Sequence, residues 1–463
     1  MNHLTTLQQL PDGVAQSTTL IAELDQCFLS GFTNLHSTQE ETVASLRRVF
    51  TGTPLAQPLA DSIAAMLRNE FMSQHFMVLA SARAALQGAQ FDHLQQQVRT
   101  ALNRTMPAEV EIAASNEAQL PSHLQVWMES AQQWLMELAL SGFARLNAGT
   151  LTPFMATLEQ IQSEPQLVAP AALLTGFFNE MMRAVPLADS ADVPLYRWVD
   201  LWTRAMIRTS QPASSAPTTP VSGYLYLLGM DLRQHANFVN LVIYGLLDHD
   251  TPQLVRIPFS SYKVDAISGA ETWLLFPQAS LLLEALAKKK VVQVQNMPLR
   301  ATGDLIWRGE AELVGKYDLF KTADQWFAAE RHNTPTLPMT APLNRHPVQL
   351  AEPLFLSGYT ITEDNKTLFI KYHDVIFPVA SERLGPLSEI TAQTLKKSSQ
   401  LFGLLRYDAG KWALQPLSIL GKNKKGKPNL ISTGINGHAI LKKPPRNNTV
   451  STLKERASRL LRA

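Results

Sequence analysis

Cysteine is almost missing from this sequence of 463 residues, since Cys27 is its single one. A scaffold held together by disulfides and a metal site made of several cysteines are therefore excluded, and the composition fits a reducing compartment. Uninterrupted apolar runs of the roughly 18 residues that a membrane span needs are missing as well. Residues 1–13 have neither the basic start nor the apolar stretch of a secretory signal. We therefore expect a cytoplasmic protein with no membrane partner.

Charged residues are sparse, at 17% of the chain, whereas hydrophobic residues make up 45%. These values are typical of a folded globular protein and exclude a collagen-like or wholly disordered chain. The length predicts two to three domains, each large enough to bury a core of its own.

Lysine is absent from residues 1–210, where 11 arginines stand against 19 acidic residues, a net charge of −8. The rest of the chain carries +10, so the near-neutral total of +2 hides two halves of opposite charge. Such an asymmetry predicts different partners for the two halves. We expect the acidic half to bind a protein.

Segment 210–220, SQPASSAPTTP, separates the two halves and has the composition of an extended linker. We expect an acidic all-α domain at 1–209, the linker at 210–220, a β-rich α+β domain at 221–420, and a basic C-terminal tail with a short helix at 421–463. Four prolines in 333–347 mark either a second linker, and so a sub-boundary, or a long loop.

The first half has the apolar spacing of a helical bundle or array, with about seven to nine helices and no convincing strand. Segments 59–71 and 122–146 carry apolar stripes, and Ser122 with Gln125 predicts a capping box for the second. Asp192 predicts the start of another helix. No fixed-period repeat is present, so a solenoid is not expected. Further helices are expected at 15–34, 39–50, 74–104 and 168–185.

The second half alternates apolar and polar residues in the manner of strands, for example at 305–313. Turn residues inside 354–373 and 401–420 predict two hairpins, which favour antiparallel pairing and an α+β or barrel-like fold. Further strands are expected at 224–231, 238–247 and 253–258, and interspersed helices at 278–289, 322–332 and 386–400.

The clearest functional signal is a cluster of cations near the C-terminus, where 395–463 hold 15 basic and two acidic residues, a net charge of +13. Clustered cations bind polyanions by releasing condensed counterions, and neighbouring aromatic rings, if exposed, stack on bases. The glycines and lysines of 421–427 predict a flexible loop. The alternatives are a solvated tail and one that docks on an acidic protein or on the acidic half. The candidate DNA- or RNA-binding residues are Arg406, Tyr407, Lys411, Trp412, Lys422, Lys424, Lys425, Lys427, Lys442, Lys443 and Arg446.

Motifs for catalysis are missing. Gly421, Gly426 and Lys427 have the spacing of a P-loop, but Pro428 stands where a hydroxyl must hold magnesium. The sequence has no serine-hydrolase elbow and no histidine pair with metal-ligand spacing, so we expect no catalytic residue, metal or cofactor. Cys27 lies in an apolar helical context that predicts a buried, inert thiol.

Two short segments resemble parts of known families. Segment 401–420, LFGLLRYDAGKWALQPLSIL, resembles a strand–turn–strand near the end of bacterial SWIM zinc-finger proteins. The cysteines that define the zinc finger are absent, so the resemblance implies no metal site. Segment 434–437, GING, resembles the glycine loop that holds nucleic-acid backbone in KH domains, and it is also typical of a tight turn.

The sequence as a whole predicts a non-enzymatic accessory or adaptor subunit of a larger complex. Its helical half would bind a protein, and its basic C-terminal region would bind nucleic acid or another polyanion. One alternative is a pure protein–protein scaffold. The other is an enzyme in the second half with a site around Asp231, His235, His249 or His373, which requires these side chains to converge.

Overall fold

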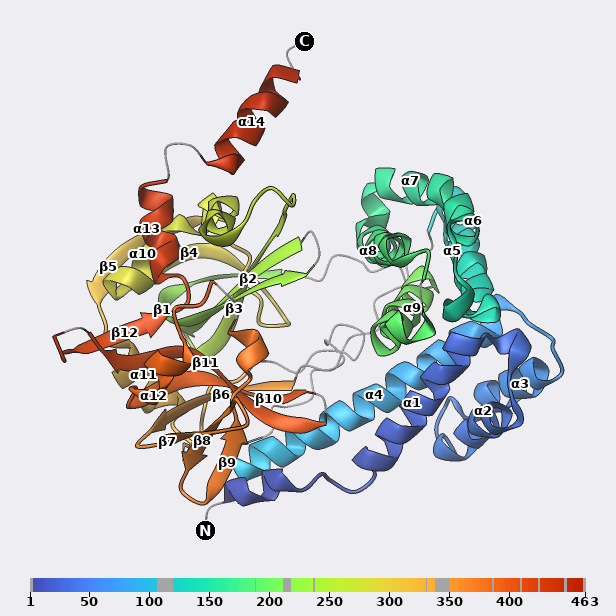
Figure 1. Cartoon of the computed structure of the whole chain (residues 1–463), viewed down its shortest axis with the longest axis horizontal. Helices are drawn as coiled ribbons and strands as arrows, with labels where there is room; N and C mark the ends of the chain where they lie inside the picture. Colours follow the sequence, from blue (N-terminus) through green and yellow to red (C-terminus); the bar gives the residue numbers. More distant parts are fainter. Residues whose placement is uncertain are drawn as a thin grey trace.

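The computed structural model describes residues 3–105, 120–187, 189–210, 218–235, 238–329, 331–337, 350–384, 387–408, 410–423, 425–444 and 448–460. A helical half and a β-rich half lie side by side, which confirms the predicted order of an N-terminal helical region and a β-rich region with interspersed helices (Figure 1). Among the described helices, none has the length and apolar character that a membrane crossing needs.

The helical half contains nine α-helices in its described residues, and they enclose one core built around Phe28, Trp198 and Trp202. The aromatic and methionine residues at helical spacing, such as Trp134 and Met181, lie in this core. The helices are α1 (Val14–Ser30), α2 (Ser37–Val49), α3 (Ala56–Leu67), α4 (Ser73–Ala101), α5 (Ser122–Ser141), α6 (Ala148–Leu151), α7 (Met155–Ser163), α8 (Val168–Ala184) and α9 (Leu195–Ser210).

The helical half repeats one structural turn. The sequence LSGFTNL at 29–35 ends α1, and LSGFARL at 140–146 ends α5. Gly31 and Gly142 have nearly the same backbone conformation, with φ of +90° and +84° and ψ of 139° in both, and each is followed by a short 3₁₀ turn. The two turns touch each other, because the hydroxyl of Thr33 donates a hydrogen bond to the carbonyl of Leu140 (2.9 Å).

The β-rich half contains three antiparallel sheets in its described residues. Sheet A has the order β3-β2-β1-β4-β5, sheet B β12-β11-β10-β6 and sheet C β7-β8-β9. The strands are β1 (Thr218–His235), β2 (Phe238–Asp248), β3 (Gln253–Tyr262), β4 (Lys290–Arg300), β5 (Glu310–Lys316), β6 (Leu350–Ser357), β7 (Thr360–Asp364), β8 (Thr367–Tyr372), β9 (Val375–Pro378), β10 (Gln400–Asp408), β11 (Lys411–Lys422) and β12 (Pro428–Ser432). The helices are α10 (Ser280–Lys288), α11 (Leu319–Phe327), α12 (Ala392–Lys396), α13 (Ile435–Lys442) and α14 (Thr449–Leu460).

Sheet B is the central layer of the β-rich half. Phe402, Leu404 and Leu417 belong to a core shared with sheet A, whereas Leu401 and Leu414 belong to a core shared with sheet C. A strand covered on both faces needs apolar residues on both, which explains why β11 is almost entirely buried.

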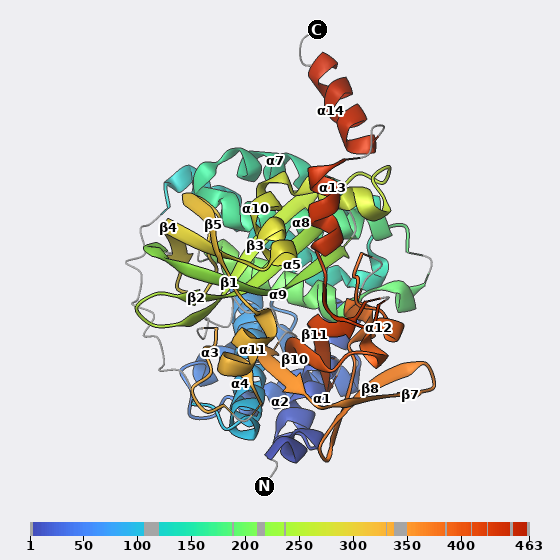
Figure 2. The same ribbon diagram turned by 90° about the vertical axis from the view of Figure 1, so that its left-hand side faces the viewer.

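Helix α4 joins the two halves (Figures 1 and 2). With 29 residues it is about 43 Å long at ~1.5 Å per residue. Its first turns pack in the helical core through Phe76, whereas Leu94 and Val98 near its end pack with sheets B and C. The N-terminal 3₁₀ turn η1 (His3–Gln8) joins the same contact through Leu4 and Leu7.

Several local predictions are wrong. Asp192 ends a 3₁₀ turn, and α9 begins three residues later, after Pro194. Gln125 makes no capping box with Ser122, because its side chain donates to the carbonyl of Leu120 instead. Leu305 pairs only through an isolated bridge, since the strand begins at Glu310. The helix expected at 386–400 is much shorter, since α12 covers only Ala392–Lys396.

The expected domain limits remain predictions. Residues 211–217 of the linker lie outside the described residues, as do 338–347 of the expected sub-boundary, and β1 already begins at Thr218. Beyond residue 420 the chain completes β11, adds β12 to sheet B and packs α13 on α10. Helix α14 projects away from the body (Figures 1 and 2).

Candidate polyanion-binding surface

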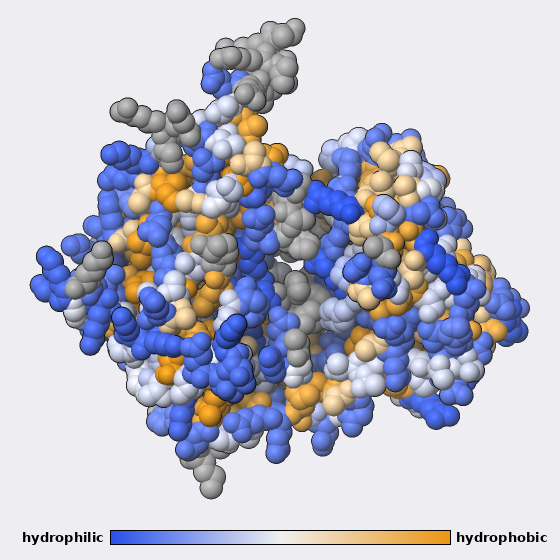
Figure 3. All heavy atoms as spheres, in the orientation of Figure 1, coloured by the Kyte–Doolittle hydropathy of each residue, from blue (hydrophilic) through white to orange (hydrophobic). Residues whose placement is uncertain are grey.

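The structure separates the candidate nucleic-acid-binding residues into three places. Strand β11 runs from Lys411 to Lys422, so about 37 Å separates its ends at ~3.4 Å per residue. Lys422, Lys425 and Lys427 lie exposed at the β11–β12 hairpin, where Figure 3 shows a hydrophilic projection at the left edge of the molecule. Lys411, also exposed, marks the opposite end of the strand. Lys442 and Lys443 are exposed at the end of α13, whereas Lys424 and Arg446 lie outside the described residues.

Two of the candidates are buried and offer no surface to a nucleic acid. Arg406 is 3% exposed, and its Nε donates to Oε1 of Gln415 inside sheet B (2.6 Å). Trp412 is 4% exposed, and its Nε1 donates to Oε1 of Gln97 on α4 (3.4 Å). Both lie on strands of the central sheet, whose two faces are covered. Tyr407 is half-buried, with its ring edge-on to Trp412.

The β11–β12 connection is a hydrogen-bonded turn, in contrast to the flexible loop expected at 421–427. The side-chain oxygen of Asn423 accepts from the backbone N–H groups of Lys425 (2.9 Å) and Lys427 (3.0 Å). Gly426 has a φ of +74°, which a residue with a side chain adopts only at a cost. A strand follows Lys427 where a P-loop has a helix, so the turn is no phosphate-binding loop of that type.

Helix α13 is held close to the body by two glycines. A Cβ on Gly437 would lie 2.6 Å from the ring of Trp273, and one on Gly434 would lie 2.6 Å from Sδ of Met230. The carboxylate of Glu389 accepts from the backbone N–H groups of Gly434 (3.2 Å) and Asn436 (2.7 Å). Segment 434–437 therefore starts a packed helix, and it is neither an exposed clamp nor a simple turn.

This packing brings cations together from three segments of the chain. Lys442 and Lys443 end α13, which packs on α10. The run Lys288, Lys289 and Lys290 leads from the end of α10 into β4. Lys316 lies directly opposite Lys290 in the register of β4 and β5. We call these six lysines the cationic face. The sequence reading missed Lys288, Lys289, Lys290 and Lys316, although three consecutive lysines at the end of an amphipathic helix were a visible signal.

Lysines from two segments of the cationic face affect the pKa of the same side chain, His438. Burial lowers the pKa of His438, and the charges of Lys288 and Lys442 lower it further, while Glu284 opposes them. Glu284 forms an ion pair with Lys288. In the part of the chain that the structure describes, no ion pair involves Lys289, Lys316, Lys442 or Lys443.

The register of β4 and β5 places two lysines of the cationic face opposite each other. Like charges directly opposite each other in a sheet are destabilising, and Lys290 and Lys316 are such a pair. Lysines in the last turn of a helix gain from the helix dipole, which accounts for Lys288 and Lys442. It does not account for Lys316.

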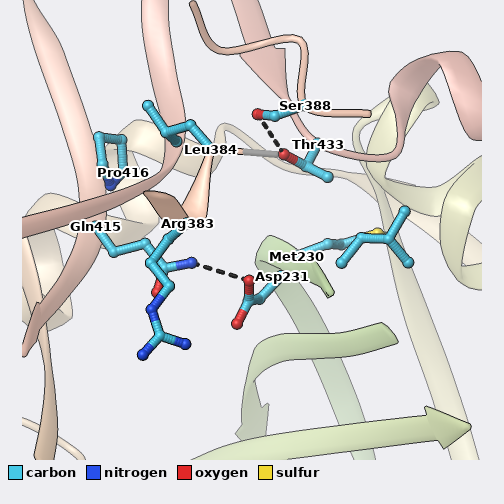
Figure 4. A pocket seen from close by; sticks show the side chains of 9 residues that line it. Met230, Asp231, Arg383, Leu384, Ser388, Gln415, Pro416 and Thr433 are labelled. Carbon is cyan, nitrogen blue, oxygen red and sulfur yellow. Dashed lines mark hydrogen bonds between the residues drawn. The ribbon is translucent and has the colours of Figure 1, made fainter. Parts of the chain in front are cut away.

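A second polar cluster lies between sheets A and B (Figure 4). The amide of Gln415 donates to Oδ1 of Asp231 (3.0 Å), and Arg233 donates to Oδ2 of the same carboxylate. The adjoining pocket is lined by Arg383, Ser388 and Thr433 and is about large enough for one water molecule. Asp231, Arg233 and Gln415 therefore satisfy one another across the contact between the two sheets, while Arg383 pairs with Asp408.

The residues of the enzyme alternative do not converge. Asp231 pairs with Val242, whereas Asp248, next to His249, pairs with Tyr224, so the length of seven residues of β1 separates the two positions. That length is about 23 Å at ~3.3 Å per residue. His373 lies in the turn between β8 and β9, and the side chain of His235 is outside the described part. Within the described residues, no three histidine, cysteine or acidic side chains form a group that would hold a metal ion.

Comparison with known proteins finds no protein-family model and no curated protein that this sequence matches. The cationic face and the charge difference between the two halves are therefore the features that bear on function.

Proposed function

We propose that this chain is a non-enzymatic accessory subunit of a larger cytoplasmic complex, and that its cationic face binds the phosphates of DNA or RNA. The helical half is proposed to bind a protein partner. The observation that carries the first part is that Lys290 and Lys316 lie opposite each other, where like charges repel, and that Lys442 and Lys443 lie exposed at the end of α13, which packs on α10. Phosphates relieve such a repulsion, and the release of their counterions adds to the affinity.

The test is a salt-titrated binding curve of the full chain with random-sequence DNA and RNA. In the test variant, Lys316, Lys442 and Lys443 are changed to Gln. In the control variant, the exposed lysines Lys366, Lys371 and Lys397 are changed to Gln, which removes the same charge away from the face.

We expect affinity to fall steeply between about 50 and about 200 mM salt, because each phosphate contact adds about 0.9 to the logarithmic slope. In the test variant, the slope of log affinity against log salt concentration should become shallower by about two to three. In the control variant it should hardly change. A flat salt response, or an equal loss in both variants, contradicts the proposal for the cationic face.

The proposed protein-binding role of the helical half is supported by its charge of −8 and by apolar side chains left exposed at helix starts. Val126 on α5 and Val168 on α8 are 57% and 64% exposed. If the chain binds no nucleic acid at low salt, the scaffold alternative takes precedence. A partner that stays bound after nuclease treatment, and is lost when Val126 and Val168 are changed to Ser, would support it.

A further inference from the structure

We infer that the nucleic acid is double-helical and is bound through its phosphates without reading the base sequence. This inference rests on the proposed function and specifies which form of nucleic acid the cationic face accepts. Two observations carry it: the position of the aromatic rings and the kind of cation on the face.

Proteins that bind single strands stack successive bases on exposed aromatic rings beside a basic groove. Neither the tryptophan under α13 nor the tryptophan among the candidate residues is available for this. Trp273 lies under α13 and is 1% exposed, and Trp412 is buried between sheet B and α4. Phe238 and Tyr262 are exposed but pack edge-to-face on each other, at a centroid distance of 5.7 Å.

One exposed ring remains within the same sheet. Tyr224 on β1 is 47% exposed and lies opposite Gln293, three residues along β4 from Lys290. A single ring stacks one base, whereas a single-strand site uses several. Tyr224 therefore does not make the face a single-strand site by itself, and it provides a direct test.

All six cations of the face are lysines, which are flexible point charges. Specific reading of bases is mainly done by side chains with two aligned hydrogen-bonding groups, such as arginine on guanine or asparagine and glutamine on adenine. Lysines on the ends of α10 and α13 and on the edge strand β5 instead suit the regularly spaced phosphates of a rigid duplex.

The experiment measures fluorescence anisotropy of the full chain with a labelled duplex of about 30 base pairs, with each of its single strands, and with a duplex of scrambled sequence. The proteins are the unaltered chain, the variant with Lys316, Lys442 and Lys443 changed to Gln, and Tyr224→Ser. Circular dichroism of each variant verifies that it is folded.

We expect the duplex to bind at least about tenfold more tightly than either single strand, and both duplexes to bind equally. The lysine variant should lose about tenfold or more in duplex affinity, and Tyr224→Ser should be unchanged. Single strands that bind as tightly as the duplex, with a loss in Tyr224→Ser, overturn the duplex inference and leave the proposed function standing. A strong preference for one duplex sequence overturns the phosphate-only part. Absence of binding to every probe overturns the proposed function itself.

Discussion

Gly31 and Gly142 lie back to back in the helical half, so close that a Cβ on Gly31 would stand 2.8 Å from the backbone nitrogen of Gly142. Both residues have positive φ, so a side chain at either position adds backbone strain to the clash. We expect Gly31→Ala to lower the free energy of unfolding by about 3 kcal/mol, from strain and overpacking together. Urea denaturation measures this change.

Gly52→Ala is the matched control, because Gly52 has a φ of +81° but no atom within 4 Å of the added Cβ. It should lose only the backbone part, about 1 kcal/mol. Equal losses in the two variants would show that the two turns are not in tight contact.

Glu352 on β6 holds two arginines of the α4 segment, Arg99 at 3.0 Å and Arg104 at 3.3 Å, and all three side chains are buried. Burial lowers the pKa of Arg104 to about 10, and the charge of Glu352 opposes this effect. We expect Glu352→Gln to cost roughly 3–5 kcal/mol, because it leaves buried guanidinium charges without a counterion. Thermal unfolding should then separate into two transitions, one for each half.

Glu363→Gln removes an exposed ion pair, with Lys396, and is the control for this loss. Its effect should stay below about 1 kcal/mol. A single transition and a comparably small effect in Glu352→Gln would mean that this contact does not couple the halves.

Cys27 is fully buried, and burial raises the pKa of its thiol to about 12, with the charge of Asp25 acting in the same direction. The thiolate is the reactive form, so we expect no labelling by a thiol reagent at pH 8 in the native protein. Complete labelling should follow in denaturant. Rapid stoichiometric labelling of the native chain would contradict the buried position.

His438 links the proposed binding to pH. Burial lowers the pKa of its imidazole, and Lys288 and Lys442 add to this effect, so the free protein holds it neutral near pH 7. A phosphate near these lysines cancels their repulsion and raises the pKa, so binding takes up a proton. Duplex affinity should therefore increase as the pH falls from about 8 to about 6, near the ordinary pKa of histidine.

His438→Asn removes this proton uptake and should flatten the pH dependence of duplex affinity. Binding curves at constant ionic strength measure the difference. A pH dependence that persists unchanged in His438→Asn would assign it to another group.

The pattern of apolar residues was sufficient to predict the two-part layout. Helical spacing depends on neighbours three and four residues apart, and strand alternation on neighbours two apart, so both are visible in one segment at a time. The hairpin at 401–420 was predicted correctly for this reason, and it forms β10 and β11. Helix starts were less predictable. Asp192 had the right chemistry for a cap, but Pro194 lies between it and α9.

The candidate binding site was only partly predictable. Lys442 and Lys443 were visible as part of a basic C-terminal region, but their neighbours Lys288, Lys290 and Lys316 come from more than a hundred residues earlier. Charge along the sequence does not show which segments will pack together. Trp412 was predicted to bind nucleic acid and does not lie on the surface. Its neighbours Tyr407 and Lys411 suggest a stacking surface, but α4 covers the tryptophan.

The sequence by itself determined the opposite charges of the two halves, the helical and β-rich layout and the inert single cysteine, because each depends on composition or on short-range spacing. Only the tertiary structure decided that Gly31 meets Gly142, that Glu352 pairs with Arg99 and that six lysines share one face. These contacts join residues far apart in the chain. They form because the burial of apolar faces drives distant segments to pack together, and charged residues at the edges of those faces then become neighbours.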